Sequence, residues 1–172
     1  NISGEDAESH HILAELSLSL HRNYDKVRFH QDRAYALNPN DPRIVSQRGE
    51  MLIWFGDAAA AVGWIEKVLL LDPSEAERRV KFLGHAHYVA RQYQEAIDAL
   101  KHTSRLGHLE HAYLAACHAA LGNQAEAATE TARVLESNSE FSIAAALKRT
   151  PFALVADREH QRETMLKAGL PA

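Results

Sequence analysis

The feature that most constrains the fold is a short motif that recurs 34 residues along the chain. Leu37-Asn38-Pro39 returns as Leu71-Asp72-Pro73, and each copy follows an apolar stretch with helical periodicity. Proline cannot continue a helix, so each copy is predicted to end one. A fixed period of this length indicates stacked units, each built from two helices.

The composition agrees with an all-α fold. Alanine, leucine, glutamate and arginine are good helix formers and are common here. Only 8 Gly and 5 Pro occur, which are too few for the many turns of an all-β protein. A hydrophobic content of 46% with 24% charged residues predicts a packed core and argues against general disorder.

Small residues recur where the two helices of each unit would cross. Gly49 and Ala61 hold these positions in one unit, Gly84 and Ala96 in the next, and Ala115 in a further one. Small side chains let two helix backbones approach closely. This pattern resembles the tetratricopeptide repeat over nearly the whole chain. The resemblance implies a right-handed superhelix of about four helix-turn-helix repeats with C-terminal capping helices.

We therefore expect a single domain over residues 1–172. The first repeat is degenerate, with Glu15 where a small residue is usual. The repeats are predicted at about 8–41, 42–75, 77–107 and 108–141, and capping helices at 142–149 and 157–167 within a tail of 142–172. The tail is expected to cover the fourth repeat with its apolar residues Phe152, Leu154, Val155, Met165, Leu166 and Leu170.

The tail also resembles one bacterial group. Phe141-Ser142-Ile143, Arg149-Thr150-Pro151-Phe152 and Leu166-Lys167-Ala168-Gly169-Leu170-Pro171 look like the end of signalling proteins in which a class III adenylate or guanylate cyclase precedes the repeats. Similar tails close arrays fused to winged-helix transcription regulators. The resemblance implies a regulatory module of a longer protein, and it does not imply that this chain makes a cyclic nucleotide.

In the tetratricopeptide family the first helix of each repeat lines a concave groove, and this implies a set of groove residues here. The middle of the groove would be polar with a basic bias, which suits an acidic peptide, and its far end apolar. Arg78, Lys81 and Tyr88 are the expected anchors, and plain solvated polarity is the alternative for each residue. The predicted partner-binding residues are Arg43, Ser46, Glu50, Arg78, Lys81, His85 and Tyr88, with Ile53, Leu109, Ala112, Ala116 and Ala119 also at groove positions.

The 11 histidines are the other unusual feature. His85 with His87, and His108 with His111, have spacings at which two imidazoles can share a metal ion. Scattered structural histidines are the favoured interpretation, so we predict no metal site and no cofactor. Motifs for a nucleophile or a phosphate loop are missing, so we predict no catalytic residues and no enzymatic activity, with a metal-dependent enzyme as the remote alternative.

Three large or reactive side chains are assigned to packing. Cys117 lies in an alanine-rich helix and is expected to be buried and inert. Trp64 fits a core position of the repeat. Trp54 is expected between repeats, with a docking patch or dimer interface as the alternative.

The remaining sequence properties point to a protein-interaction module. A net charge of −4 gives no case for nucleic acid, and no apolar run is long enough for a membrane span. The start at Asn1, without a leader pattern, predicts a part of a longer chain, and a single cysteine favours a reducing, cytoplasmic location. The expected partner is a peptide, another protein or the chain's own N-terminal catalytic domain, with homodimerisation as the alternative role.

Overall fold

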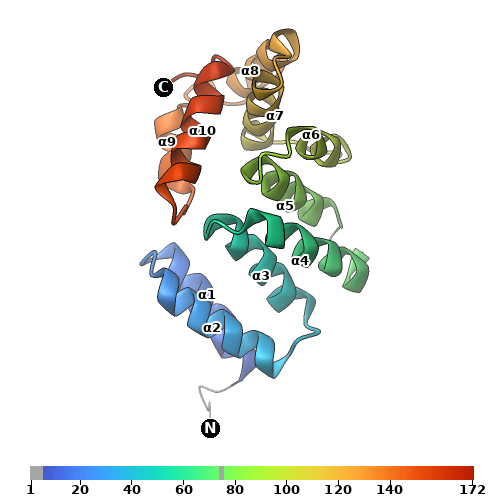
Figure 1. Cartoon of the computed structure of the whole chain (residues 1–172), viewed down its shortest axis with the longest axis vertical. Helices are drawn as coiled ribbons and strands as arrows, with labels where there is room; N and C mark the ends of the chain where they lie inside the picture. The colour runs from blue at the N-terminus through green and yellow to red at the C-terminus, as the bar shows by residue number, and fades with distance from the viewer. Residues whose placement is uncertain (1–5, 74–75) are drawn as a thin grey trace.

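The computed structural model describes residues 6–73 and 76–172 of the chain, and within these ranges it contains helices and no strands. Figure 1 shows helix pairs stacked side by side into an arc, with a final pair folded back against it. The helices are α1 (Ala7–Ser19), α2 (Tyr24–Leu37), α3 (Pro42–Trp54), α4 (Ala58–Leu71), α5 (Ala76–Val89), α6 (Tyr93–Lys101), α7 (His108–Ala120), α8 (Gln124–Ser137), α9 (Ile143–Arg149) and α10 (Val155–Lys167).

Successive helices pair as the repeat predicts. Helices α1 and α2, α3 and α4, α5 and α6, and α7 and α8 pack against each other, and the second helix of each of the first three pairs also packs on the first helix of the next pair. Helix α3 begins at Pro42 and α7 at His108, the residues at which the second and fourth repeats are predicted to begin. The boundary at 75 lies outside the described residues.

Each pair turns at an equivalent position with a left-handed backbone. The φ angles of Arg22, Gly56, Arg91 and Gly122 are +47°, +86°, +64° and +84°. Glycine adopts this conformation freely, whereas arginine does so at a steric cost. The same turn geometry is therefore kept in all four pairs, although the residue type changes.

Close helix crossings explain the recurring glycines. A Cβ atom added at Gly49 would lie 2.9 Å from Ile65 of α4, and one at Gly84 would lie 2.6 Å from Leu100 of α6. Both positions therefore require the absence of a side chain. In the first repeat the small residue is Ala14, fully buried against Val27 and Met51, and Glu15 is exposed. The predicted register of this repeat was wrong by one residue.

The tail packs on the fourth repeat through α10, but only some of the predicted apolar residues are buried. Phe152 contacts Trp54 at the end of α3, with 5.3 Å between ring centroids, and the Ala153 amide donates to the Trp54 carbonyl at 2.8 Å. Helix α10 then runs along α7, where Met165 is fully buried. Leu154, Val155 and Leu166 are exposed, which corrects their assignment as covering residues.

Candidate partner-binding groove

The first helices of the repeats line two adjoining hollows that share Arg78. The larger hollow, of about 340 Å³, lies between α1, α3 and α5, and the smaller hollow, of about 200 Å³, lies between α5 and α7. The larger hollow is lined by His11, Glu15, Leu18, Arg43, Ser46, Gln47, Glu50, Met51, Trp54, Arg78 and Arg79. The smaller hollow is lined by Arg78, Lys81, Phe82, His85, Glu110 and Tyr113. We call the two hollows together the open groove.

The open groove brings six of the seven predicted binding residues together: Arg43, Ser46, Glu50 and Arg78 in the larger hollow, with Lys81 and His85 in the smaller one.

Arg43 is neutralised within the protein. Its guanidinium lies 2.7 Å from Glu8 and 2.8 Å from Asp41, and these carboxylates raise its pKa above the ordinary value. Asp41 also accepts the Arg43 amide at 2.9 Å as the N-cap of α3. Arg43 therefore contributes less free positive charge to the groove than its sequence position implies.

Glu50 lies in the larger hollow as a largely buried acid. Burial raises the pKa of its carboxyl group, against the opposing effects of a hydrogen bond from Ser46 and the nearby charges of Arg78 and Arg79. The Ser46 hydroxyl donates to Glu50 at 2.9 Å. Desolvation is the largest cause of this shift, because burial disfavours the charged carboxylate.

Arg78 and Lys81 are the groove cations without an ion-pair partner among the described residues. Arg78 lies 6.0 Å from the centre of the Phe82 ring, and Lys81 shares the smaller hollow with it. Unpaired cations beside aromatic rings suit a carboxylate-bearing ligand. These two residues therefore carry the basic bias that the sequence predicts for the middle of the groove.

Arg79 was not recognised from the sequence. Its side chain is 9% exposed and its Nη2 lies 3.3 Å from Asp72, while its Nε finds no hydrogen-bond partner among the described residues. Arg79 directly follows the predicted groove residue Arg78, but its own position is not among those that line the groove in the tetratricopeptide repeat. The larger hollow thus has a third guanidinium in its wall, beside those of Arg43 and Arg78, and this one is buried.

Tyr88 does not line the open groove, which contradicts its prediction as an anchor. Its side chain is fully buried, and its hydroxyl lies 2.6 Å from the Thr164 hydroxyl of α10. His85 is also buried, 4.2 Å from the Tyr113 ring and 4.7 Å from the Trp54 ring between centroids. Burial lowers the pKa of His85 to about 3, so its imidazole is neutral at physiological pH.

Tyr88 is buried because α10 packs into the far half of the concave face. The apolar end predicted from Ala112, Ala116 and Ala119 is fully buried on α7, the helix against which α10 packs. We call the part of the concave face that α10 covers, with Tyr88, Ala112, Ala116 and Ala119, the covered groove. Ile53 is fully buried in the core as well, and Leu109 is partly buried.

The candidate histidine pairs do not meet. His111 bonds Glu130 at 2.7 Å, while His108 lies edge-on to Phe141, and His87 bonds Gln92 at 2.7 Å. The histidines that do meet are His10 and His30, whose Nδ1 atoms lie 2.9 Å apart across α1 and α2. The two residues are 20 positions apart in the sequence, so the short helical spacings that indicate a histidine pair do not apply to them.

Neither a metal site nor a membrane span is seen in the part of the chain that the structure describes. Among those residues, groups of three or more His, Cys, Asp or Glu arranged to hold a metal ion are absent. The described helices are all too short or too polar to cross a bilayer.

Cys117 and Trp54 lie where packing predicts, whereas Trp64, predicted at a core position, is only partly buried and belongs to neither core cluster. Cys117 is fully buried, and burial raises the pKa of its thiol. Trp64 packs edge-on to Tyr35 at 5.1 Å, outside the open groove. Trp54 packs between repeats on His85 and Phe152, and it also lines the larger hollow.

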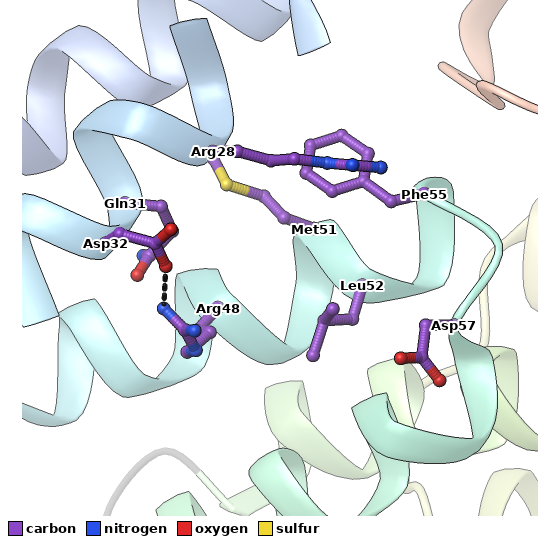
Figure 2. A pocket seen from close by; sticks show the side chains of 8 residues that line it. All are labelled: Arg28, Gln31, Asp32, Arg48, Met51, Leu52, Phe55 and Asp57. Carbon is purple, nitrogen blue, oxygen red and sulfur yellow. Dashed lines mark hydrogen bonds and ion pairs between the residues drawn. The ribbon is translucent and has the colours of Figure 1, made fainter. Parts of the chain in front are cut away.

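A third hollow, of about 310 Å³, lies between α2 and α3. Figure 2 shows Arg28 lying over the Phe55 ring, 5.0 Å from its centre, and Arg48 paired with Asp32 at 2.8 Å. Asp57 stands at the opposite side, where it accepts the Ala60 amide as the N-cap of α4. Its charges balance, with two arginines and two aspartates in its lining, so it has no basic bias like that of the open groove.

Comparisons with known proteins support the fold but assign no function. The sequence matches no model of a known protein family and no curated protein. The structure is similar to the crystal structure of the MamA protein, with a TM-score of 0.65 and 17% sequence identity. The match covers 96% of this chain and 91% of that chain. At this identity the likeness shows a tetratricopeptide-type helical-repeat fold and carries no function by itself.

Proposed function

We propose that this chain is a protein-interaction module without enzymatic activity, and that it binds an acidic peptide segment in its open groove. The observation that carries the proposal is the pair of cations, Arg78 and Lys81, that have no ion-pair partner among the described residues. The hollow beside them offers Trp54 and Met51 as apolar contacts. A helical-repeat scaffold presents such a surface rigidly, which limits the entropy lost on binding.

The proposal predicts which peptides the groove selects. A random-sequence displayed peptide library panned against the whole chain is expected to yield sequences rich in Asp and Glu. A selected peptide should bind the Arg78→Glu, Lys81→Glu double variant about a hundredfold more weakly, because two charge-assisted hydrogen bonds are lost. Its affinity for the wild-type chain should fall as salt is added.

Lys148→Glu is the matched control, because Lys148 is an exposed cation at the end of α9, outside the open groove. This variant is expected to bind the selected peptide like the wild-type chain. A selection without acidic enrichment, or an affinity that the double variant leaves unchanged, would overturn the proposed function.

The biological setting belongs to the proposal as well. The tail resemblance supports a regulatory region of a longer bacterial signalling protein, either a class III cyclase or a winged-helix regulator, and the partner is then a separate protein or the parent's own catalytic domain. A cytoplasmic location is supported by the single, buried and unpaired Cys117.

Homodimerisation is a second candidate role, favoured by one exposed face. Ile12, Leu16 and Leu20 are 45%, 43% and 68% exposed and follow one stripe of α1. Apolar stripes of this kind suit a helix from a second copy. Light scattering of the wild-type chain is then expected to give the mass of a dimer, and Leu16→Glu that of a monomer. A monomeric wild-type chain at high concentration would end this alternative.

A further inference from the structure

Helix α10 lies against the covered groove with a face that is mainly polar. The buried residues of α10 recur at helical spacing along one stripe: Asp157, Gln161, Thr164 and Met165, followed by Ala168 just past its end. Asp157 and Gln161 are 6% and 0% exposed. A helix that is kept in place by the hydrophobic effect alone would bury apolar residues on this stripe.

Side-chain hydrogen bonds and one ion pair fasten this stripe to the repeats. Asp157 accepts from Arg91 at 2.8 Å, and the Thr164 hydroxyl lies 2.6 Å from that of Tyr88. His160, beside the stripe, bonds the Tyr93 hydroxyl at 2.9 Å. The attachment is therefore specific, because each bond needs a particular partner on α5, on α6 or on the turn between them.

The same interface contains buried polar atoms without partners. Gln161 Oε1 and His160 Nδ1 find no hydrogen-bond partner among the described residues. Gln161 Nε2 has only the Met165 sulfur, at 3.8 Å. A buried polar atom left unpaired opposes the packed state, because it is bonded to water when the interface opens.

We propose that the covered groove is a second interaction surface and that α10 is its resident, displaceable occupant. The partner that takes its place is a helix of another protein with the same chemistry: a carboxylate that meets Arg91, and an apolar side chain two turns later that packs on α7. This inference rests on the proposed function, because a groove that admits partners is its premise. It adds that the groove has two halves and that the chain itself controls access to one of them.

Displacement would join the two halves. The Trp54 and His85 rings pack together, and each lines one hollow of the open groove. Tyr88, next to His85 on the same helix, lies under α10. When α10 leaves, Tyr88, Ala112 and the other alanines of α7 continue the surface that begins at Arg78. The residues implied by the repeat would then form one groove.

Hydrogen exchange of the free 172-residue chain tests the opening without any partner. We expect the amides of α10 to exchange faster than those of α8. Gln161→Leu removes the unpaired oxygen and should slow exchange in α10 about tenfold. Asp157→Asn removes the ion pair to Arg91 and should speed it about tenfold. Neither variant should change α8.

Glu163→Gln is the matched control, since Glu163 is an exposed carboxylate on the same helix. It is expected to leave exchange in α10 unchanged. Equal exchange of α10 and α8 in the wild-type chain, with equal responses of both helices to the variants, would overturn the inference. The open groove would keep its proposed function in that case, because its test depends on Arg78 and Lys81 alone.

Exchange of the occupant is tested with a peptide of known sequence. A fluorescein-labelled synthetic peptide of residues 150–172 should bind the 172-residue chain in trans. Because its affinity depends on how often α10 leaves the covered groove, it should bind Asp157→Asn about tenfold more tightly and Gln161→Leu about tenfold more weakly. Binding that is absent, or identical in all variants, would contradict displacement.

Discussion

Two glycines of the helix interiors differ in what surrounds them. A Cβ atom at Gly84 would lie 2.6 Å from Leu100 Cγ, whereas one at Gly63 would meet nothing within 4 Å. Gly84→Ala should therefore lower the free energy of unfolding by about 1–3 kcal/mol through overpacking. Gly63→Ala, in an exposed helix position, should raise it by about 0.5–1 kcal/mol. Urea denaturation measures both, and an equal effect of the two substitutions would contradict the helix crossing.

Cys117 shows how burial decides reactivity. Its side chain is fully buried and desolvation raises its pKa, so the reactive thiolate is scarce. We expect a chromogenic disulfide reagent to leave the native chain unlabelled at pH 7.5 and to label it fully in denaturant. Labelling of the native chain as fast as that of the unfolded chain would show that α7 is not packed as described.

At the scale of helices, the sequence predicts the pairs and the packing of the tail on the fourth repeat, but it misses most of the residues that α10 buries. Gly49, Gly84 and the proline stops are visible because packing requires those residue types at fixed spacing. The stripe that α10 buries includes the predicted Met165, but its other members, Asp157, Gln161 and Thr164, are polar and an apolar pattern does not include them. The apolar residues chosen instead include Val155, which is 73% exposed. Pairing with Arg91 and Tyr88 is a long-range property that local pattern does not encode.

The same reasoning applies to the predicted groove. Arg78 and Lys81 were found because the repeat register fixes which positions face inward. Tyr88 has an equivalent register position, yet α10 covers it. Arg43 faces the groove, but the neutralising Glu8 comes from another helix, 35 residues away. Register therefore predicts orientation, whereas accessibility and charge balance depend on segments distant in sequence.

The hydrogen bond between Tyr88 of α5 and Thr164 of α10 is expected to stabilise the folded chain. Tyr88→Phe removes the bond to Thr164, whose hydroxyl keeps its bond to the His160 carbonyl at 2.8 Å. The free energy of unfolding should fall by about 1 kcal/mol. Tyr113→Phe is the control, because the hydroxyl of this buried tyrosine has no hydrogen-bond partner among the described residues. A loss as large for Tyr113→Phe would mean that the α5–α10 bond contributes nothing specific.

At the scale of the whole molecule, the tail connects the two ends of the array. The Arg22 side chain donates to the Lys148 carbonyl, and the Tyr24 hydroxyl donates to the Phe152 carbonyl at 3.3 Å. Figure 1 shows the result, with the turn between α9 and α10 lying close to that between α1 and α2. The arc is therefore braced by contacts that a strictly linear repeat array lacks.

Two histidines with lowered pKa values make the stability of the molecule depend on pH. Burial lowers the pKa of His85 to about 3 and that of His160 to about 4, from an ordinary value of 6.5. Below pH 6.5 the unfolded chain binds protons that the native chain does not, so stability is full above this pH and falls as pH decreases. Denaturation at pH 7, 6 and 5 should show the decline.

His85→Phe should flatten this decline, because phenylalanine cannot bind the proton and fits among the Trp54 and Tyr113 rings. His21→Phe, at an exposed turn position, is the control and should keep the slope of the wild-type chain. An unchanged slope in His85→Phe would show that this imidazole is not buried uncharged.

Tryptophan fluorescence tests most directly whether acidic peptides bind in the open groove. Trp54 lines the larger hollow and Trp64 lies outside it, so each single-tryptophan variant reports on one place. With a selected acidic peptide that lacks aromatic residues, Trp64→Phe, which retains Trp54, should shift its emission on saturation. Trp54→Phe, which retains Trp64, should not. A response from Trp64 alone, or none from Trp54 at saturating peptide, would contradict binding in the groove.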